Sequence, residues 1–88
     1  ESFAQVADAL DAAQHSSEQM AAQEKALNVA QQNLELTRES LSEGFANVLQ
    51  VLDSERLYQQ ARLGYVRAQA QRLADTAQLF VALGGAQP

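Results

Sequence analysis

Apolar residues recur every seven positions through the first half of the chain. One row of this spacing consists of Val6, Ala13, Met20, Leu27, Leu34 and Leu41. Such a row is typical of a helix that packs lengthwise against another helix. We expect the positions three residues before each member to share its seam, but these are apolar only at the start, at Phe3 and Leu10. The pattern predicts a helix over residues 3–42 whose apolar seam narrows towards its end.

A second apolar row runs along the same segment. Ala22, Val29 and Leu36 follow one another at intervals of seven, with Ala26 beside them. Leu27 of the first row and Val29 of the second are about 200° apart on a helix that turns ~100° per residue. The first helix is therefore expected to carry two apolar rows on nearly opposite faces.

The second half of the chain repeats this arrangement. One row consists of Leu49, Leu52, Leu63, Val66, Ala70, Leu73, Ala77 and Phe80, with Arg56 and Gln59 as its polar members. The other consists of Val51, Tyr58, Tyr65, Arg72 and Leu79, each followed three residues later by a small or polar residue: Ser54, Ala61, Ala68, Asp75 and Ala82. Large side chains alternating with small ones allow closely spaced helices to interlock. These rows predict a second helix over residues 48–83.

Two apolar rows on each helix favour a neighbour on both sides of that helix. We expect such helices to assemble side by side, as a bundle or as an α-barrel. Because two of the four rows would otherwise face water, the chain is expected to self-associate as a dimer or a larger assembly. An ordinary four-helix bundle made of two hairpins fits the same pattern, so both arrangements stay open.

The segment between the helices contains the signals of a tight turn. Gly44 can adopt the left-handed conformation that ends a helix. Asn47 is a good N-cap for the second helix, and Gln50 stands three residues later, as in a capping box. The pair Gly84 and Gly85 is expected to end the second helix. The predicted fold is all-α, one long antiparallel helical hairpin that occupies residues 1–88 as a single domain.

Composition supports long helices and excludes several functions. The chain has a net charge of −5, with 11 acidic against 6 basic residues, which argues against binding to nucleic acid or to anionic membrane surfaces. There is no cysteine and no apolar run long enough to span a bilayer, so we expect no disulfide and no membrane contact by this segment. Because the sequence starts at Glu1 without a methionine, we expect a piece of a larger or processed protein.

Residues able to perform chemistry are few. His15 is the only histidine and has no acidic partner in register, so no metal site is expected. Asp53, Glu55 and Arg56 lie close to the turn, where the negative charge of Asp53 favours the positive end of the helix dipole. Paired carboxylates act as acid and base only in a cleft that limits solvent access, and a thin hairpin offers none. We predict no catalytic residue and no cofactor, and hence no enzyme.

The residues around and after the turn resemble a known family. They are Gly44, Val48 with Leu49, residues 51–56 (VLDSER), Leu57, residues 61–63 (ARL) and residues 82–85 (ALGG). In this order they resemble the TolC-like outer membrane factors, the outer membrane efflux proteins of bacterial efflux and type I secretion systems, including the OprM/NodT-type subgroup. Residues 3–10 are similar to the segment in which the long helix of this family leaves the membrane barrel. The resemblance covers essentially the whole chain.

The resemblance implies a fold, a location and partners. Proteins of this family form trimers with an α-helical tunnel across the periplasm, and this chain resembles the hairpin of the C-terminal repeat. The implied location is therefore the periplasmic part of an outer membrane protein. In this family the turn meets the helical hairpin of a periplasmic adaptor, which links the channel to an inner-membrane pump, and it also closes the resting channel. The implied adaptor-binding tip consists of Ser42, Glu43, Gly44, Phe45 and Ala46.

The sequence departs from the family where the gate is concerned. Many members have a tyrosine three residues before the tip glycine, and some have an arginine two residues after it; this chain has Leu41 and Ala46 there. A gate built on that pair is therefore not expected. Leu41, Asp53 and Arg56 are the alternative candidates for a gating role.

Two other functions fit the same pattern. The hairpin of a periplasmic adaptor also places heptads on both sides of a tight turn, although its tip usually carries an Arg-Leu-Ser/Thr motif where this chain has Ser-Glu-Gly-Phe. A plain coiled-coil oligomerisation module is the third possibility, and it predicts that changes at the tip leave function intact. The sequence does not indicate the transported substrate, the partner pump or the source of energy.

Overall fold

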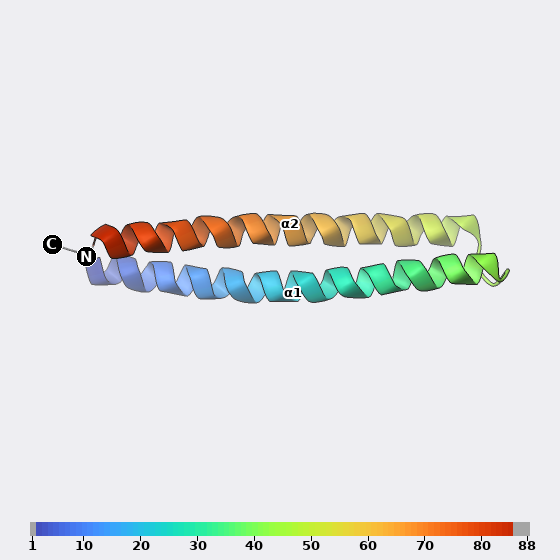
Figure 1. The fold of residues 1–88 in the computed structure, drawn as a ribbon, viewed down its shortest axis with the longest axis horizontal. Helices are drawn as coiled ribbons and strands as arrows, with labels where there is room; N and C mark the ends of the chain where they lie inside the picture. The colour runs from blue at the N-terminus through green and yellow to red at the C-terminus, as the bar shows by residue number, and fades with distance from the viewer. Residues whose placement is uncertain (1, 86–88) are drawn as a thin grey trace.

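The protein folds into two long antiparallel helices joined by a short turn (Figure 1). The computed structural model describes residues 2–85. Helix α1 spans Ser2–Ser42 and helix α2 spans Val48–Gly85, and no strand occurs within these residues. The hairpin measures 68 × 13 × 12 Å between its outermost Cα atoms. The predicted all-α helical hairpin is confirmed.

The helix ends agree with the predicted ends to within two residues. Helix α1 ends at Ser42 and α2 begins at Val48, as predicted. The described part of α2 reaches Gly85, the second residue of the pair predicted to end it. Only Gly44 has a positive φ among the described residues, which is the conformation that does end a helix.

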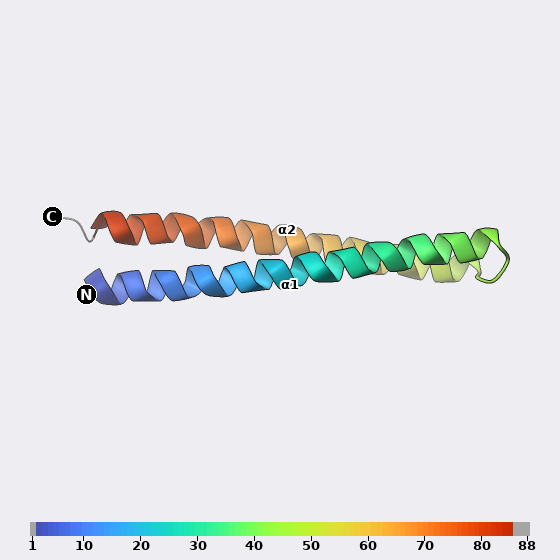
Figure 2. The same cartoon turned by 60° about the horizontal axis from the view of Figure 1, so that its bottom comes forward.

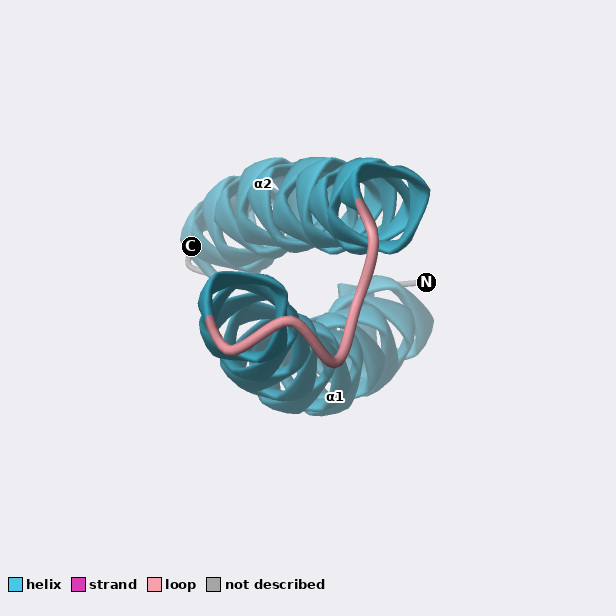
Figure 3. Ribbon diagram, turned by 90° about the vertical axis from the view of Figure 1, so that its right-hand side faces the viewer, coloured by secondary structure: helices cyan, strands magenta, loops and turns pink. Residues whose placement is uncertain are grey.

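The two helices meet along a narrow inner seam and twist around each other (Figures 2 and 3). On α1 this seam contains the predicted row from Val6 to Leu41, all of whose members are buried or half-buried. On α2 it contains Val51, Tyr58, Tyr65 and Leu79, while Arg72 of the same row is exposed. The first row of α1 and the Val51 row of α2 therefore form the contact between the helices.

The residues that accompany the first row of α1 differ from those predicted. Phe3 and Leu10, three residues before members of the row, are 91% and 52% exposed. The seam instead includes the residues three positions after each member, which are buried or half-buried: Ala9, Ser16, Gln23, Ala30 and Thr37. The equivalent α2 residues, Ser54, Ala61, Ala68, Asp75 and Ala82, are also buried or half-buried. Mostly small side chains at these positions allow the helices to approach closely, which Phe3 and Leu10 would prevent.

The remaining apolar rows, which we call the outer rows, face solvent. Val29 and Leu36 of α1 are 60% and 63% exposed, and Leu49, Leu73 and Phe80 of α2 are 74%, 73% and 70% exposed. With the inner seam placed as observed, helical geometry puts the α1 row of Ala22, Val29 and Leu36 about 130° from the middle of the seam and the α2 outer row about 160° from it. The outer row of α2 therefore lies nearly opposite the seam, and the outer row of α1 lies away from the seam but turned towards one flank of the hairpin.

Candidate functional site

The turn at the tip is fixed by hydrogen bonds to the end of α1. Gly44 has a φ of 83°, in the left-handed region. Its amide donates to the Leu41 carbonyl at 3.1 Å, and the Phe45 amide donates to the Ser40 carbonyl at 2.8 Å. This pair of bonds is the Schellman motif, which satisfies carbonyls that the last helical turn leaves unpaired. The predicted left-handed turn at Gly44 is confirmed.

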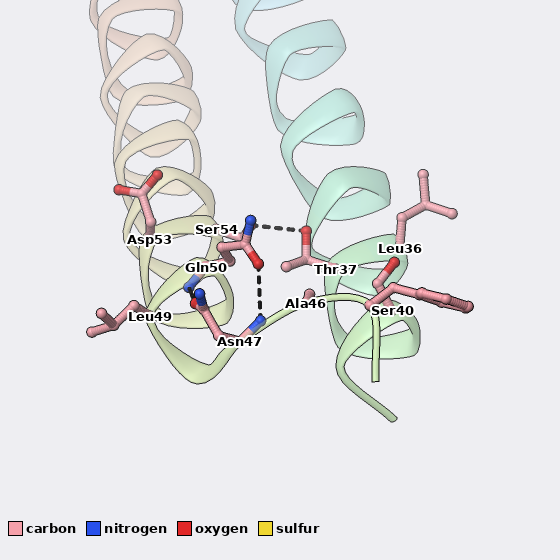
Figure 4. Close-up of a pocket in the computed structure, with 10 residues that line it drawn as sticks. Leu36, Thr37, Ser40, Ala46, Asn47, Leu49, Gln50, Asp53 and Ser54 are labelled. Atoms are coloured by element: carbon pink, nitrogen blue, oxygen red, sulfur yellow. Dashed lines mark hydrogen bonds between the residues drawn. The ribbon is translucent and has the colours of Figure 1, made fainter. Parts of the chain in front are cut away.

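The start of α2 is fixed by a reciprocal cap (Figure 4). The Gln50 amide donates to Asn47 Oδ1 at 2.8 Å, and the Asn47 amide donates to Gln50 Oε1 at 2.9 Å. The predicted capping box is confirmed. Both helix ends at the tip are therefore held by local bonds, and the residues between them have a defined backbone.

An open groove lies beside the turn, between the end of α1 and the start of α2. Thr37 and Ser54 point towards each other across it, and their side chains are joined by a hydrogen bond (Figure 4). Its apolar lining comes from Leu36, Phe45 and Leu49, which are 63%, 83% and 74% exposed. The groove thus combines an exposed apolar rim with hydroxyl groups between the helices.

Charged side chains near the tip form two exposed ion pairs. Arg56 Nη2 lies 2.9 Å from Asp53 Oδ1 within α2, and Arg38 Nη2 lies 3.2 Å from Glu55 Oε1 across the two helices. Exposed pairs of this kind are worth about 0–1 kcal/mol each. The two pairs add little to the stability of the hairpin, but they set the charges that a partner meets near the tip.

The predicted site residues are only partly brought together. Phe45, Ala46, Asn47, Gln50 and Asp53 line the groove beside the turn. Ser42, Glu43 and Gly44 are exposed on the turn itself, whereas Leu41 is half-buried as a member of the inner seam.

Five further residues of the groove were missed, namely Leu36, Thr37, Ser40, Leu49 and Ser54. Leu36 and Leu49 each belong to an outer row, so their exposure could have been inferred from the pattern. Thr37 carries no signal in the sequence, because its place in the seam depends on how α1 is rotated against α2.

The described residues also bear on two other kinds of site. No group of three or more His, Cys, Asp and Glu side chains is arranged to hold a metal ion within residues 2–85. In the same part of the chain, neither helix combines the length and the apolar character needed to cross a membrane.

A comparison with protein families gave one match. The family described as outer membrane efflux protein matches residues 1–85, which include both helices and the turn. Comparison with curated proteins gave no match, and comparison with solved structures gave none either.

Proposed function

Since this chain belongs to the outer membrane efflux protein family, we propose that its hairpin forms part of the periplasmic wall of an efflux or type I secretion channel. Proteins of this family are components of outer membrane transport channels, form trimers and work with adaptor proteins. In the proposed role the tip, residues 42–46, binds the helical hairpin of a periplasmic adaptor and helps to close the pore. The hairpin performs no catalysis there, and it communicates with an inner-membrane pump only through the adaptor.

The outer rows support a position within a wall of helices. Exposed apolar rows on both helices are suited to neighbouring helices, and burial of apolar surface stabilises such contacts by about 25 cal/mol per Å². Neighbours placed about 130° and about 160° from the inner seam would produce a curved array of helices, as a tunnel requires. The hairpin would thus be one part of a larger channel protein whose other helices cover these rows.

The exposure of Phe45 is the observation that carries the adaptor-binding proposal. Its side chain is 83% exposed on a turn whose backbone is fixed on both sides. Exposed aromatic side chains on a preorganised backbone are effective anchors, because little conformational entropy is lost when a partner covers them. Glu43, next to Gly44, is also exposed. Its negative charge would favour a basic residue of the adaptor over an acidic one.

The proposed gating role falls on Asp53 and Arg56 rather than on Leu41. Leu41 is half-buried in the inner seam, where packing within the hairpin accounts for its apolar side chain. Asp53 and Arg56 form an exposed pair close to the tip, with side chains 60% and 57% exposed. An exposed pair is free to exchange partners with charges on a neighbouring hairpin, as a gate that opens and closes requires.

Substitution of Phe45 tests adaptor binding. We expect Phe45→Asp to reduce drug resistance in cells that depend on this channel, because a charged side chain would have to be desolvated at the contact. Phe3→Asp is the matched control, since Phe3 is 91% exposed at the opposite end of the hairpin and should tolerate the change. Channel abundance and trimer formation are measured in parallel and should be the same for both variants.

Equal resistance with Phe45→Asp and with Phe3→Asp would reject the proposed role of the tip. That result would favour the plain oligomerisation module, in which only the helix rows matter. Loss of resistance accompanied by loss of the trimer would show that Phe45 acts in assembly and not in adaptor binding.

A further inference from the structure

A closed ring of hydrogen bonds joins α1 and α2 near the turn. Asn33 Nδ2 donates to Ser54 Oγ at 3.3 Å, and Ser54 Oγ donates to Thr37 Oγ1 at 3.0 Å. Thr37 Oγ1 in turn donates to the backbone carbonyl of Asn33 at 2.7 Å, which closes the ring. Each hydroxyl donates one bond and accepts one. Ser54 is only 5% exposed, so its hydroxyl depends on these partners instead of water.

Apart from the close approach of Gln23 to Gly64, the rest of the inner seam does little to distinguish one alignment of the helices from another. Its large and small residues both recur at intervals of seven along α1 and along α2. Sliding one helix by seven residues, about 10 Å at 1.5 Å per residue, would again place large rows beside small rows. The repeat therefore specifies which faces meet and leaves their longitudinal register weakly specified.

The turn and the ion pair also leave the register incompletely specified. The hydrogen bonds around Gly44 lie at the end of α1, and those of Asn47 lie at the start of α2. None of them joins one helix to the other. Unwinding the last turns of α1 would lengthen the connection and allow α1 to slide towards the tip. The Arg38–Glu55 pair does join the helices, but its side chains are 57% and 43% exposed. An exposed pair of this kind opposes sliding by little.

We propose that the ring formed by Asn33, Thr37 and Ser54 sets the register of α1 against α2. If α1 slides seven residues towards the tip, Ser54 faces Ala26 and Ala30 in place of Asn33 and Thr37. Neither alanine side chain can accept or donate a hydrogen bond, so the buried hydroxyl loses its partners. A buried polar group without a partner costs more than its hydrogen bonds contribute when they are made, so the ring acts chiefly by penalising wrong alignments. This role is independent of whatever partner the tip binds.

Cysteine cross-linking reads the register directly, because the chain contains no cysteine of its own. Gly64→Cys is combined in turn with Gln23→Cys and with Ser16→Cys, and a short thiol cross-linker is added to the chain. In the structure Gln23 lies against Gly64: a Cβ atom at residue 64 would lie 2.6 Å from Gln23 Oε1. The Gln23 pair therefore reports the native register. The Ser16 pair reports α1 displaced by seven residues towards the tip.

The ring is removed with Asn33→Ala, Thr37→Val and Ser54→Ala together. We expect the helix content to be retained, since alanine is a strong helix former and valine is about as good a helix former as threonine. The ratio of slipped to native cross-links should rise roughly tenfold, the effect that about 1.4 kcal/mol has on an equilibrium constant. Thr37→Ser retains the hydroxyl and should give the native pattern.

Two results would overturn the proposal. One is a triple variant that gives only the native cross-link between residues 23 and 64. The other is a chain with the intact ring whose ratio of slipped to native cross-links is as high as that of the triple variant. If the triple variant loses its helix content, the single variant Thr37→Val takes its place in the test. Valine has nearly the shape of threonine but lacks the hydroxyl group, so it breaks the ring. A purely stabilising role for the ring would lower the melting temperature and leave the cross-linking pattern unchanged.

Discussion

At the scale of single residues, the turn depends on one backbone conformation. Gly44 has a φ of 83°, and a Cβ atom added there would meet nothing within 4 Å. The requirement for glycine is therefore conformational and does not arise from lack of space. Left-handed backbone costs about 1–2 kcal/mol for residues with a Cβ atom, and β-branched residues tolerate it least.

Gly44→Val is accordingly expected to lower the free energy of unfolding by about 2 kcal/mol. Gly44→Asn is the matched comparison and should lose less, because asparagine adopts the left-handed conformation more readily. Urea unfolding followed by circular dichroism, at one protein concentration, measures both. Equal losses for the two variants would show that Gly44 is required for some reason other than its φ.

At the scale of the helices, Gly64 marks the place where the side chain of Gln23 packs against α2. A Cβ atom at residue 64 would lie 2.6 Å from Gln23 Oε1 and 3.4 Å from its Cδ. The obstructing atom is the end of a flexible side chain, so it can move aside. Alanine also gains roughly 1 kcal/mol over glycine in a helix interior.

We therefore expect Gly64→Ala to stabilise the hairpin by about 0.5–1 kcal/mol. Thermal unfolding followed by circular dichroism would record this as a higher melting temperature. The double variant Gln23→Ala/Gly64→Ala separates the two contributions, since it removes the side chain that must move. A lower melting temperature in Gly64→Ala that the double variant restores would mean that the close approach of Gln23 outweighs helix propensity.

At the scale of the whole molecule, the hairpin buries one apolar row of each helix and exposes the other. Leu73 and Phe80 of the α2 outer row are 73% and 70% exposed, and Val29 and Leu36 of the α1 outer row are 60% and 63% exposed. Contiguous exposed apolar rows on a soluble chain favour association with other surfaces. We predict that the chain is helical and forms a dimer or a larger assembly in solution.

Sedimentation over a range of concentrations tests this prediction. Leu73→Glu should shift the chain towards the monomer without reducing its helix content, because Leu73 lies outside the inner seam. Gln69→Glu adds the same charge nearby at an exposed polar position and should leave the assembly unchanged. A stable monomer at high concentration would contradict the prediction and would mean that the outer rows do not suffice for association.

The sequence by itself determined the features that depend on local interactions. Gly44 ends α1, and Asn47 with Gln50 begins α2, because each acts through bonds to residues a few positions away. The heptad row from Val6 to Leu41 also indicated which large residues of α1 face its partner, since a seven-residue repeat keeps one face of a helix in contact.

The tertiary structure alone decided how each helix is rotated and aligned. It placed the residues after the Val6–Leu41 row in the inner seam in place of Phe3 and Leu10, and so turned the α1 outer row towards one flank. It also brought Asn33 and Thr37 to Ser54, 17 to 21 residues away in sequence. These features depend on which side chains of the opposite helix fit closely, and a periodic pattern within one helix does not contain that information.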